Sequence, residues 1–254
     1  MQELWNKSAR YLYDTLGGHV RLVGGCVRDH LLHKEFSDRD MATTLTPEEV
    51  IAKLDRAHIP HVDIGKDFGT VIAKVDGMPF EITTLRKDIK TDGRHAVVAW
   101  AKRWSTDARR RDFTVNALYA DIHGKIWDYV GGVDDLKQNR LRFIGSPDKR
   151  IKEDYLRILR YFRFFTLMKE KTVPKDVACA IQKHKEGLNS LSGDRKRDEM
   201  FRLIIQPGAD KTLTVMEDMG ILSYLQQIQF SKKQKKYFFE HDIETMLARF
   251  NFLV

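Results

Sequence analysis

Cysteine is nearly absent from this sequence of 254 residues, which contains two, Cys26 and Cys179. Two thiols cannot form a disulfide framework or supply four ligands to a zinc ion, so a reducing compartment is expected. No apolar run approaches the roughly 18 residues that a membrane-spanning helix requires. The first residues, MQELWNKSARYLYDTLGG, have scattered charges and lack the apolar core of a signal peptide. These absences exclude a disulfide-rich secreted domain and a membrane protein, and they predict a cytoplasmic protein.

Charge, by contrast, is plentiful. Lys and Arg total 44, Asp and Glu total 36, and the formal net charge is +8. A basic balance suits a nucleic-acid or nucleotide partner, although a solvated basic surface is the commoner explanation. The length allows one large domain or roughly two to three small ones, with a hydrophobic core that needs no metal or disulfide.

Helix and strand signals are mixed up to about residue 146. Thr46, Pro47 and Glu49 form a capped helix start. The runs TVIAKV and PFEITT on either side of Asp76-Gly77-Met78 predict a hairpin. We expect helices over 3–16, 25–32 and 47–57, strands over 20–23, 38–42, 70–75, 79–84, 124–129 and 141–144, and a long loop over 86–105.

After Gly145-Ser146-Pro147 the pattern predicts helices alone, over 151–168, 174–187, 194–205, 209–218 and 221–227. The run SKKQKK at 231–236 is interpreted as a solvated turn. The fold class is therefore α+β, with a mixed sheet followed by an all-α part.

Asp38 and Asp40 lie two residues apart on an expected strand, so their carboxylates project from one face. A divalent cation such as Mg²⁺ is the usual way to keep such a pair ionised. Taken alone, however, two solvated aspartates at a strand end are the commoner explanation. The segment upstream, GGCVRDHLLHKEF, adds a glycine pair, a helix start and Arg28. Gly25 lets backbone N–H groups approach an anion, and Arg28 is a bidentate phosphate donor, so the ordered combination suggests a nucleoside-triphosphate site.

Two further segments carry candidate side chains. Glu81 on the second hairpin strand is a third carboxylate for a two-metal site, and a surface glutamate explains it equally well. In RRRDFTVNAL, Arg111 could neutralise phosphate, while Asp112 and Asn116, at the start of an expected helix, could bind a ribose hydroxyl. Helix capping by Asp112 is the alternative.

The segment RIKEDYLRILRYFRFF opens the helical part. Asp154, Arg157, Arg160 and Arg163 recur every third residue and predict one ridge along a helix. A row of arginines is usually a solvated face. A carboxylate one turn before an arginine can nevertheless read a base edge, because it accepts from the exocyclic amino group that cytosine and adenine share.

In order along the chain, GGCVRD, DRD, FEITTLR, RRRDFTVNAL, DYVGGVDDL, EDYLRILRYFRF and LSGDRKRDE resemble the motifs of the class II CCA-adding tRNA nucleotidyltransferases. That family shares its head domain with bacterial poly(A) polymerases, within the polymerase-β-like superfamily. The resemblance covers roughly the first 225 residues. It implies a nucleotidyltransferase head over 1–146, a helical neck over 147–205 and the start of a helical body over 206–254.

The resemblance also implies roles for the candidate residues. Asp38 and Asp40 would be metal ligands, assisted by Glu81. Gly25 and Arg28 would contact the triphosphate, with Arg111, Asp112 and Asn116 around the ribose and phosphates. Asp154 and Arg157 would read the base, and Arg160 and Arg163 would help to position the nucleotide. TDGRHAVV at 91–98 corresponds to the family's flexible loop, which is linked to the switch from CTP to ATP.

Family members generally continue through a longer body and tail, so the chain ending at Val254 is either truncated or a reduced form. The leading hypothesis is the template-independent addition of CCA to tRNA from CTP and ATP with Mg²⁺. A poly(A) polymerase, an enzyme adding only CC or only A, and a non-catalytic RNA-binding protein on the same fold stay open. The oligomeric state is not indicated.

Overall fold

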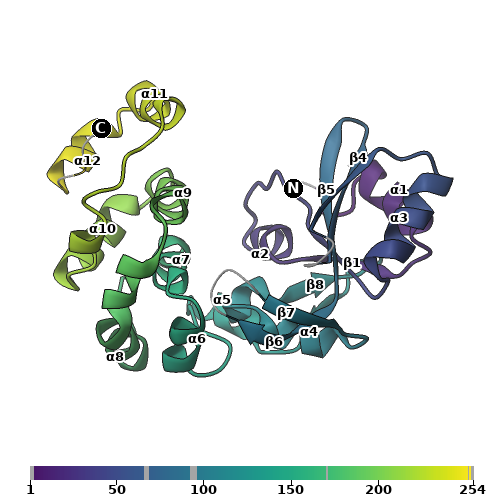
Figure 1. Ribbon diagram of the computed structural model, residues 1–254, viewed down its shortest axis with the longest axis horizontal. Coiled ribbons are helices and arrows are strands. Elements are labelled where there is room, and N and C mark those ends of the chain that lie inside the picture. The colour runs from purple at the N-terminus through teal and green to yellow at the C-terminus, as the bar shows by residue number, and fades with distance from the viewer. Residues whose placement is uncertain (1–2, 66–68, 92–95, 170, 251, 253–254) are drawn as a thin grey trace. The chain divides into compact units, whose positions relative to one another are not determined.

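The computed structural model describes residues 3–65, 69–91, 96–169, 171–250 and 252. The chain divides into two compact units, Met1–Ile144 and Gly145–Val254, coloured purple to teal and teal-green to yellow in Figure 1. This division lies beside residue 146, where the sequence signals change. The further separation of residues 147–205 from 206–254 stays a prediction.

A seven-stranded mixed sheet forms the centre of the first unit, with the strand order β3-β4-β5-β2-β1-β8-β9. Strands β2 and β5 are parallel, and the other neighbours are antiparallel. The strands are β1 (Val20–Val23), β2 (Met41–Thr43), β3 (His61–Gly65), β4 (Thr70–Val75), β5 (Met78–Thr84), β8 (Leu118–Ala120) and β9 (Ile126–Asp128). The predicted α+β class with a mixed sheet is confirmed.

The two faces of this sheet carry separate hydrophobic clusters, because successive strand residues point to opposite faces. Leu118 and Ala120 join the larger cluster, whereas Tyr119 between them joins the smaller one with Ala42. Helices α1 (Lys7–Thr15) and α3 (Pro47–Arg56) pack on the face of the larger cluster (Figure 1). Helix α4 (Trp104–Arg110) packs against the smaller cluster, on what we call the second face.

The predicted capping box and hairpin are both confirmed. The side chain of Thr46 accepts a hydrogen bond from the backbone N–H of Glu49, whose carboxylate accepts one from the N–H of Thr46. Asp76 and Gly77, with φ of 50° and 78°, make the tight turn between β4 and β5. The turn fixes the hairpin register, which in turn fixes the face from which each β5 side chain projects.

Two strand predictions and one loop prediction for this unit are wrong. The strand expected over 38–42 is β2, Met41–Thr43, because Asp38 and Asp40 are poor strand formers and precede it. The loop expected over 86–105 contains a two-stranded sheet, β6 (Arg86–Thr91) with β7 (Ala96–Trp100), followed by α4. The strand expected over 141–144 is reduced to an isolated bridge between Phe113 and Phe143. Part of the expected flexible loop, residues 92–95, lies outside the described residues.

The second unit is helical throughout its described residues, as predicted. Its helices are α6 (Pro147–Glu153), α7 (Leu156–Phe165), α8 (Lys175–His184), η3 (Lys185–Ser190), α9 (Gly193–Ile204), α10 (Ala209–Asp218), η4 (Leu222–Tyr224), α11 (Lys232–Glu240) and α12 (Glu244–Arg249).

The run SKKQKK is not a turn. Ser231 and Gln234 form a capping box at the start of α11, and buried Phe238 packs its ring against those of Phe201 and Phe230. Over the parts of the chain that the structure describes, no helix combines the length and the apolar character needed to cross a membrane.

Candidate active site

The Asp-Arg-Asp segment before β2 is anchored by its central residue. Arg39 is buried, and its Nε and Nη2 donate to the carbonyl oxygens of Leu4 (3.1 Å) and Glu3 (3.0 Å). The backbone N–H of Val23 donates to the carbonyl of Asp40 (2.9 Å), so the hydrogen-bonded ladder with β1 reaches this residue. Arg39 is thus turned into the protein, whereas Asp38 and Asp40 on either side of it are exposed.

Asp40 and Glu81 occupy equivalent positions on neighbouring parallel segments. Met41 of β2 pairs with Ile82 of β5. Asp40 directly precedes Met41, and Glu81 directly precedes Ile82. Ile82 belongs to the larger cluster, so Glu81 projects from the second face. The same alternation directs Asp40 to the face of Ala42, and adjacent strands lie only about 4.8 Å apart.

The electrostatics of Asp40 reflect this crowding. Although the side chain of Asp40 reaches solvent, the surrounding protein atoms partly desolvate its carboxylate. This desolvation, followed by the negative charges of Glu81 and Asp38, raises the pKa of Asp40 to about 6, and the positive charge of Arg111 opposes the rise. Three carboxylates that act on one another in this way fit a hard divalent cation, whose charge would relieve their repulsion. Among the side chains that the structure describes, no three His, Cys, Asp or Glu residues converge into a preformed metal site.

The glycine pair forms the start of α2 (Gly25–Leu31), directly after β1. Gly24 has φ 78° and ψ −124°, a conformation that favours glycine. Arg28, buried on this helix, donates from Nε and Nη2 to both carboxylate oxygens of Asp29, and from Nη1 to Oδ1 of Asn116 (2.6 Å). Arg28 therefore links the helix that follows the glycine turn to Asn116, which lies 88 residues after Arg28 in the sequence.

The helix expected after Asp112 is wrong. Thr114–Asn116 forms a single 3-10 turn, and strand β8 follows it. The carboxylate of Asp112 accepts from the backbone N–H of Phe113 (2.8 Å) and from Nδ2 of Asn116 (3.4 Å). Asp112, Asn116 and Arg28 thus form one continuous hydrogen-bonded chain.

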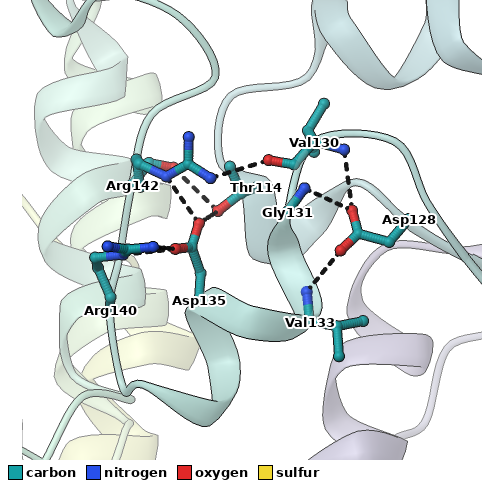
Figure 2. A network of polar contacts seen from close by, with 8 residues as sticks. All are labelled: Thr114, Asp128, Val130, Gly131, Val133, Asp135, Arg140 and Arg142. Atoms are coloured by element: carbon teal, nitrogen blue, oxygen red, sulfur yellow. Dashed lines mark hydrogen bonds and ion pairs between the residues drawn. The ribbon is translucent and has the colours of Figure 1, made fainter.

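The DYVGGVDDL motif lies next to this turn and supports it (Figure 2). Asp128 accepts from the backbone N–H groups of Val130, Gly131 and Val133 at the start of α5 (Gly132–Lys137). Hydrogen bonds from these N–H groups outweigh the effect of burial and lower the pKa of Asp128. A β-carbon on Gly132 would lie 2.2 Å from the carbonyl oxygen of Thr114, so glycine allows α5 to approach the turn.

Buried Asp135 of the same helix completes the support. Its carboxylate accepts from Oγ1 of Thr114 (2.6 Å) and from Nε of Arg142 (3.0 Å), and it also pairs with Arg140 (Figure 2). The motif therefore holds the Thr114 turn in place.

Arg111 is held by two residues that the sequence analysis missed, Asp107 and Tyr119. Nε and Nη2 of Arg111 donate to Oδ2 of Asp107 at 3.2 and 3.1 Å, and the Tyr119 hydroxyl donates to the same oxygen at 2.7 Å. Burial alone would raise the pKa of Asp107, but its charged neighbours, Arg111 first, lower it to about 2. Helical spacing was the available signal, because Asp107 precedes Arg110 and Arg111 by three and four residues.

The ridge expected in the second unit is interrupted at its first member. Asp154 has φ −156° and ψ 110°, so it separates α6 from α7 and is not part of a helix. Its carboxylate accepts from the N–H of Leu156 (3.1 Å) and from Nη2 of Arg195 (2.9 Å). Arg157 donates to the carboxylate of Glu153 (2.5 Å) and to a backbone carbonyl. Asp154 and Arg157 are thus anchored by different neighbours.

The other two arginines of the expected ridge lie on α7. Arg163 pairs with buried Glu199, and the guanidinium groups of Arg163 and Arg160 lie over the Phe164 ring, at 4.1 and 5.6 Å from its centroid. Both Glu199 and Arg195 come from α9. The LSGDRKRDE motif therefore supplies partners to Arg163 and Asp154.

Two family models match the chain. Residues 20–142 match the poly A polymerase head domain, and residues 172–230 match a model described as the probable RNA and SrmB-binding site of polymerase A. The first range contains the carboxylates, α2 and the Arg111–Asn116 segment.

The chain is similar to proteins that are named for the addition of CCA to tRNA. It is 39% identical over 208 residues to the mitochondrial CCA tRNA nucleotidyltransferase 1 of Danio rerio, covering 81% of this chain and 48% of that protein. It is 34% identical to the CCA-adding enzyme of Bacillus pumilus, covering 87% and 54%.

Among solved structures, the Bacillus stearothermophilus CCA-adding enzyme in complex with CTP is similar, with a TM-score of 0.78 and 30% identity over 99% of this chain and 59% of that one. The chain spans about half the length of the curated relatives it matches. The order of the motifs, the fold and these similarities agree, and the chain belongs to the family of CCA-adding tRNA nucleotidyltransferases and poly(A) polymerases.

Proposed function

We propose that this chain catalyses the template-independent addition of CCA to the 3′ end of tRNA, using CTP and ATP. The observation that carries the proposal is the arrangement on the second face of the sheet. Asp40 lies there beside Glu81. Partial desolvation, followed by the charges of Glu81 and Asp38, raises the pKa of Asp40, and the positive charge of Arg111 opposes this. Carboxylates next to a held arginine suit the transfer of a charged phosphoryl group.

Asp38 and Asp40, assisted by Glu81, are the residues that would hold Mg²⁺. When bound, the ion would polarise the attacking ribose hydroxyl and neutralise charge on the phosphates. The anchored Arg39 keeps both aspartates turned outward, so the chain itself supplies their orientation.

The first unit also provides donors for the nucleotide. The backbone N–H groups around Gly25 and the guanidinium groups of Arg28 and Arg111 would bind the triphosphate, because each is a donor to phosphate oxygens. Asn116 and Asp112, which already form hydrogen bonds with each other and with the α2 side, would bind the ribose hydroxyls. Their mutual contacts reduce the freedom that would be lost on binding.

In the second unit, Asp154 and Arg157 would select the base. A carboxylate accepts a hydrogen bond from the amino group of cytosine or adenine, and a guanidinium donates to a ring nitrogen or carbonyl. Their anchoring by Arg195 and Glu153 supports this role, since a reader must be rigid to discriminate. Arg160 and Arg163, held over Phe164, would help to position the nucleotide.

Two products are compatible with this chemistry. The names of the relatives, CCA tRNA nucleotidyltransferase and CCA-adding enzyme, favour CCA addition. The description of the head-domain model as poly A polymerase favours the second candidate, polyadenylation.

A primer-extension assay separates these candidates. The chain is incubated with Mg²⁺ and labelled CTP, ATP, UTP or GTP, on tRNAs that end before the first C or after CC, and on an unrelated RNA. CCA addition predicts incorporation of C, C and A on the first tRNA and of A alone on the second, with growth then stopping. Long A tails on any RNA would instead establish polyadenylation, and failure with all four nucleotides would reject both.

Two variants that each remove one aspartate charge are compared, one in the site and one as a control. Asp40→Asn is expected to abolish incorporation, because it removes a metal ligand. Asp14→Asn removes the same charge from an exposed position on α1 and is expected to retain full activity. Full activity of Asp40→Asn would reject the metal-site assignment.

The cytoplasm is proposed as the compartment. The mitochondrial protein of Danio rerio makes the organelle the competing location. Fluorescence microscopy of the tagged protein in its native cell distinguishes the two.

A further inference from the structure

Asp107, near the second face, accepts four side-chain hydrogen bonds, and the proposed reaction does not yet use it. Its side chain is 1% exposed. Oδ1 accepts from Nε of Arg110 at 2.7 Å. Oδ2 accepts from the Tyr119 hydroxyl at 2.7 Å and from Nη2 and Nε of Arg111 at 3.1 and 3.2 Å. Such a set of bonds fixes the carboxylate in both position and rotation.

The same bonds fix one edge of the Arg111 guanidinium. Its Nε and Nη2 face Asp107, and Nε also donates to the Tyr119 hydroxyl at 3.3 Å. Its third nitrogen, Nη1, lies on the other side, 3.7 Å from the point where a β-carbon on Gly24 would be. The guanidinium is thus next to the glycine turn, and its charge also acts on Asp40. That location is where the proposed function puts the triphosphate.

The ring of Tyr119 is itself immobilised. It is fully buried, and the rings of Trp104 and Tyr129 contact it edge-on, with centroid distances of 5.6 and 5.9 Å. Its hydroxyl can therefore donate to Asp107 from one direction only. The hydroxyl satisfies the second carboxylate oxygen without adding charge.

Asp107 forms ion pairs with two arginines, Arg110 and Arg111. A buried carboxylate is costly unless it is fully paired, and replacing such groups with apolar ones is often neutral or stabilising. Stability alone therefore does not explain this cluster. An arginine side chain loses rotamer entropy when it is immobilised, and holding it in advance removes that cost from ligand binding.

We propose that Asp107, together with the Tyr119 hydroxyl, is a positioning residue that holds the Arg111 guanidinium in the orientation in which it binds the nucleotide triphosphate. This inference rests on the proposed function, since it needs Arg111 to contact the phosphates. It adds two residues that act through Arg111 and do not touch the nucleotide.

The direction in which the Kd for the nucleotide changes distinguishes a positioning role of Asp107 from a purely electrostatic one. Replacing Asp107 by Asn removes a negative charge near the site, and electrostatics alone would then tighten the binding of a triphosphate. Loss of positioning predicts the opposite. We expect Asp107→Asn to raise the Kd for CTP and for ATP, measured by isothermal titration calorimetry with Mg²⁺, by about tenfold, and Tyr119→Phe to raise it by about threefold.

A double-mutant cycle tests whether the effect passes through Arg111. In an Arg111→Ala background, Asp107→Asn should change the Kd by less than about twofold. The matched control is Tyr129→Phe, which removes a hydroxyl that accepts from Arg21 and does not contact Asp107. This control should leave the Kd unchanged. If Asp107→Asn fails to fold, as judged by circular dichroism, Tyr119→Phe and the corresponding cycle with Arg111→Ala carry the test.

Three results would overturn the inference. They are unchanged or tighter nucleotide binding by Asp107→Asn, an equal loss in the presence and absence of Arg111, and unchanged binding by Arg111→Ala. The first two leave the proposed function standing if the unmodified chain binds CTP and ATP and extends tRNA. The third removes Arg111 from the triphosphate site and leaves the proposed reaction standing on the same condition. Absence of nucleotide binding by the unmodified chain would instead overturn the proposed function and this inference together.

Discussion

Replacing Asp40 by Asn should stabilise the first unit while it abolishes nucleotide addition. Burial and the charges of Glu81 and Asp38 raise the pKa of Asp40 from 3.8 to about 6, against the attraction of Arg111. Between about pH 4 and pH 6 the folded state retains a proton that the unfolded state has released. The stability therefore falls as the pH rises through this window, and the full penalty is present above pH 6. Asparagine carries no charge and avoids the penalty.

The size of the penalty follows from the shift. A rise of about two pKa units corresponds to about 3 kcal/mol, because each unit is worth about 1.4 kcal/mol. Although its carboxylate is partly desolvated, the side chain of Asp40 still reaches solvent, which screens its interactions, so we reduce this figure to about 1 kcal/mol. For a chain of this length, such a change raises Tm by about 2 to 4 °C.

The measurement is urea denaturation and differential scanning fluorimetry at pH 7.5 and pH 4, in the presence of a chelator. Asp40→Asn should be more stable than the unmodified chain at pH 7.5 and equally stable near pH 4. Asp14→Asn makes the same change in net charge on α1 and should show no gain at either pH.

Magnesium provides the second half of this test. A cation that binds the native carboxylates stabilises the folded state by mass action. Addition of Mg²⁺ should therefore raise Tm of the unmodified chain and of Asp14→Asn, and it should raise Tm of Asp40→Asn much less. The reasoning is refuted if Asp40→Asn is no more stable at pH 7.5, if its gain is independent of pH, or if Mg²⁺ stabilises all three chains equally.

Three further variants test other parts of the site. Gly132→Ala should lower the free energy of unfolding by about 2 to 3 kcal/mol in urea, since its β-carbon would lie 2.2 Å from the Thr114 carbonyl oxygen; an unchanged value would contradict the close approach of α5. Asp128→Asn should cost about 1 kcal/mol at pH 7, because a carboxylate with a lowered pKa stabilises the fold above its unfolded pKa; the cost should shrink as the pH falls below about 4, and a cost that does not depend on pH would contradict the charge-assisted cap. Arg195→Ala should raise misincorporation of UTP in the primer-extension assay, because Asp154 loses its anchor; unchanged selectivity would exclude a role for this ion pair.

Local signals were sufficient for several elements. The capping box at Thr46 and the Asp76-Gly77 turn depend on side chains within a few residues of each other, and both were predicted at the residues where they occur. The change to helices beside residue 146 was also visible, because it alters the period of the apolar residues over a long stretch. The glycine pair likewise marked the start of α2.

Elements that depend on distant partners were missed. The strands β6 and β7 stabilise each other, and the charged sequence of β6 shows no alternation that would predict it alone. Helix α11 has four lysines, and it depends on Phe238 packing against Phe230 and against Phe201, which is distant in the sequence. The break at Asp154 interrupts a spacing of three residues that looks continuous, because its carboxylate is bound to Arg195 of another helix.

In the candidate site, too, features set by local signals were predicted and features that depend on distant partners were missed. Spacing suggested Asp38 and Asp40 as carboxylates that project together, and Glu81 was offered as a third carboxylate on another strand. The parallel pairing of β2 with β5 brings Asp40 and Glu81 to neighbouring positions. The residues that hold the site were not suggested. Asp107 and Asp135 are buried and belong to helices that the sequence analysis did not predict.

These two buried aspartates explain how a short irregular segment can present functional groups accurately. The segment from Arg111 to Asn116 contains one 3-10 turn, so regular secondary structure does little to fix it. Asp107 holds its first residue through the guanidinium, and Asp135 holds its middle through the Thr114 hydroxyl. Each of these carboxylates also pairs with further arginines. Directional polar bonds at two points therefore add to the packing of buried Phe113 and Val115. They orient side chains such as Arg111 and Asn116, whose polar ends would have to stay outside the apolar core to bind a nucleotide.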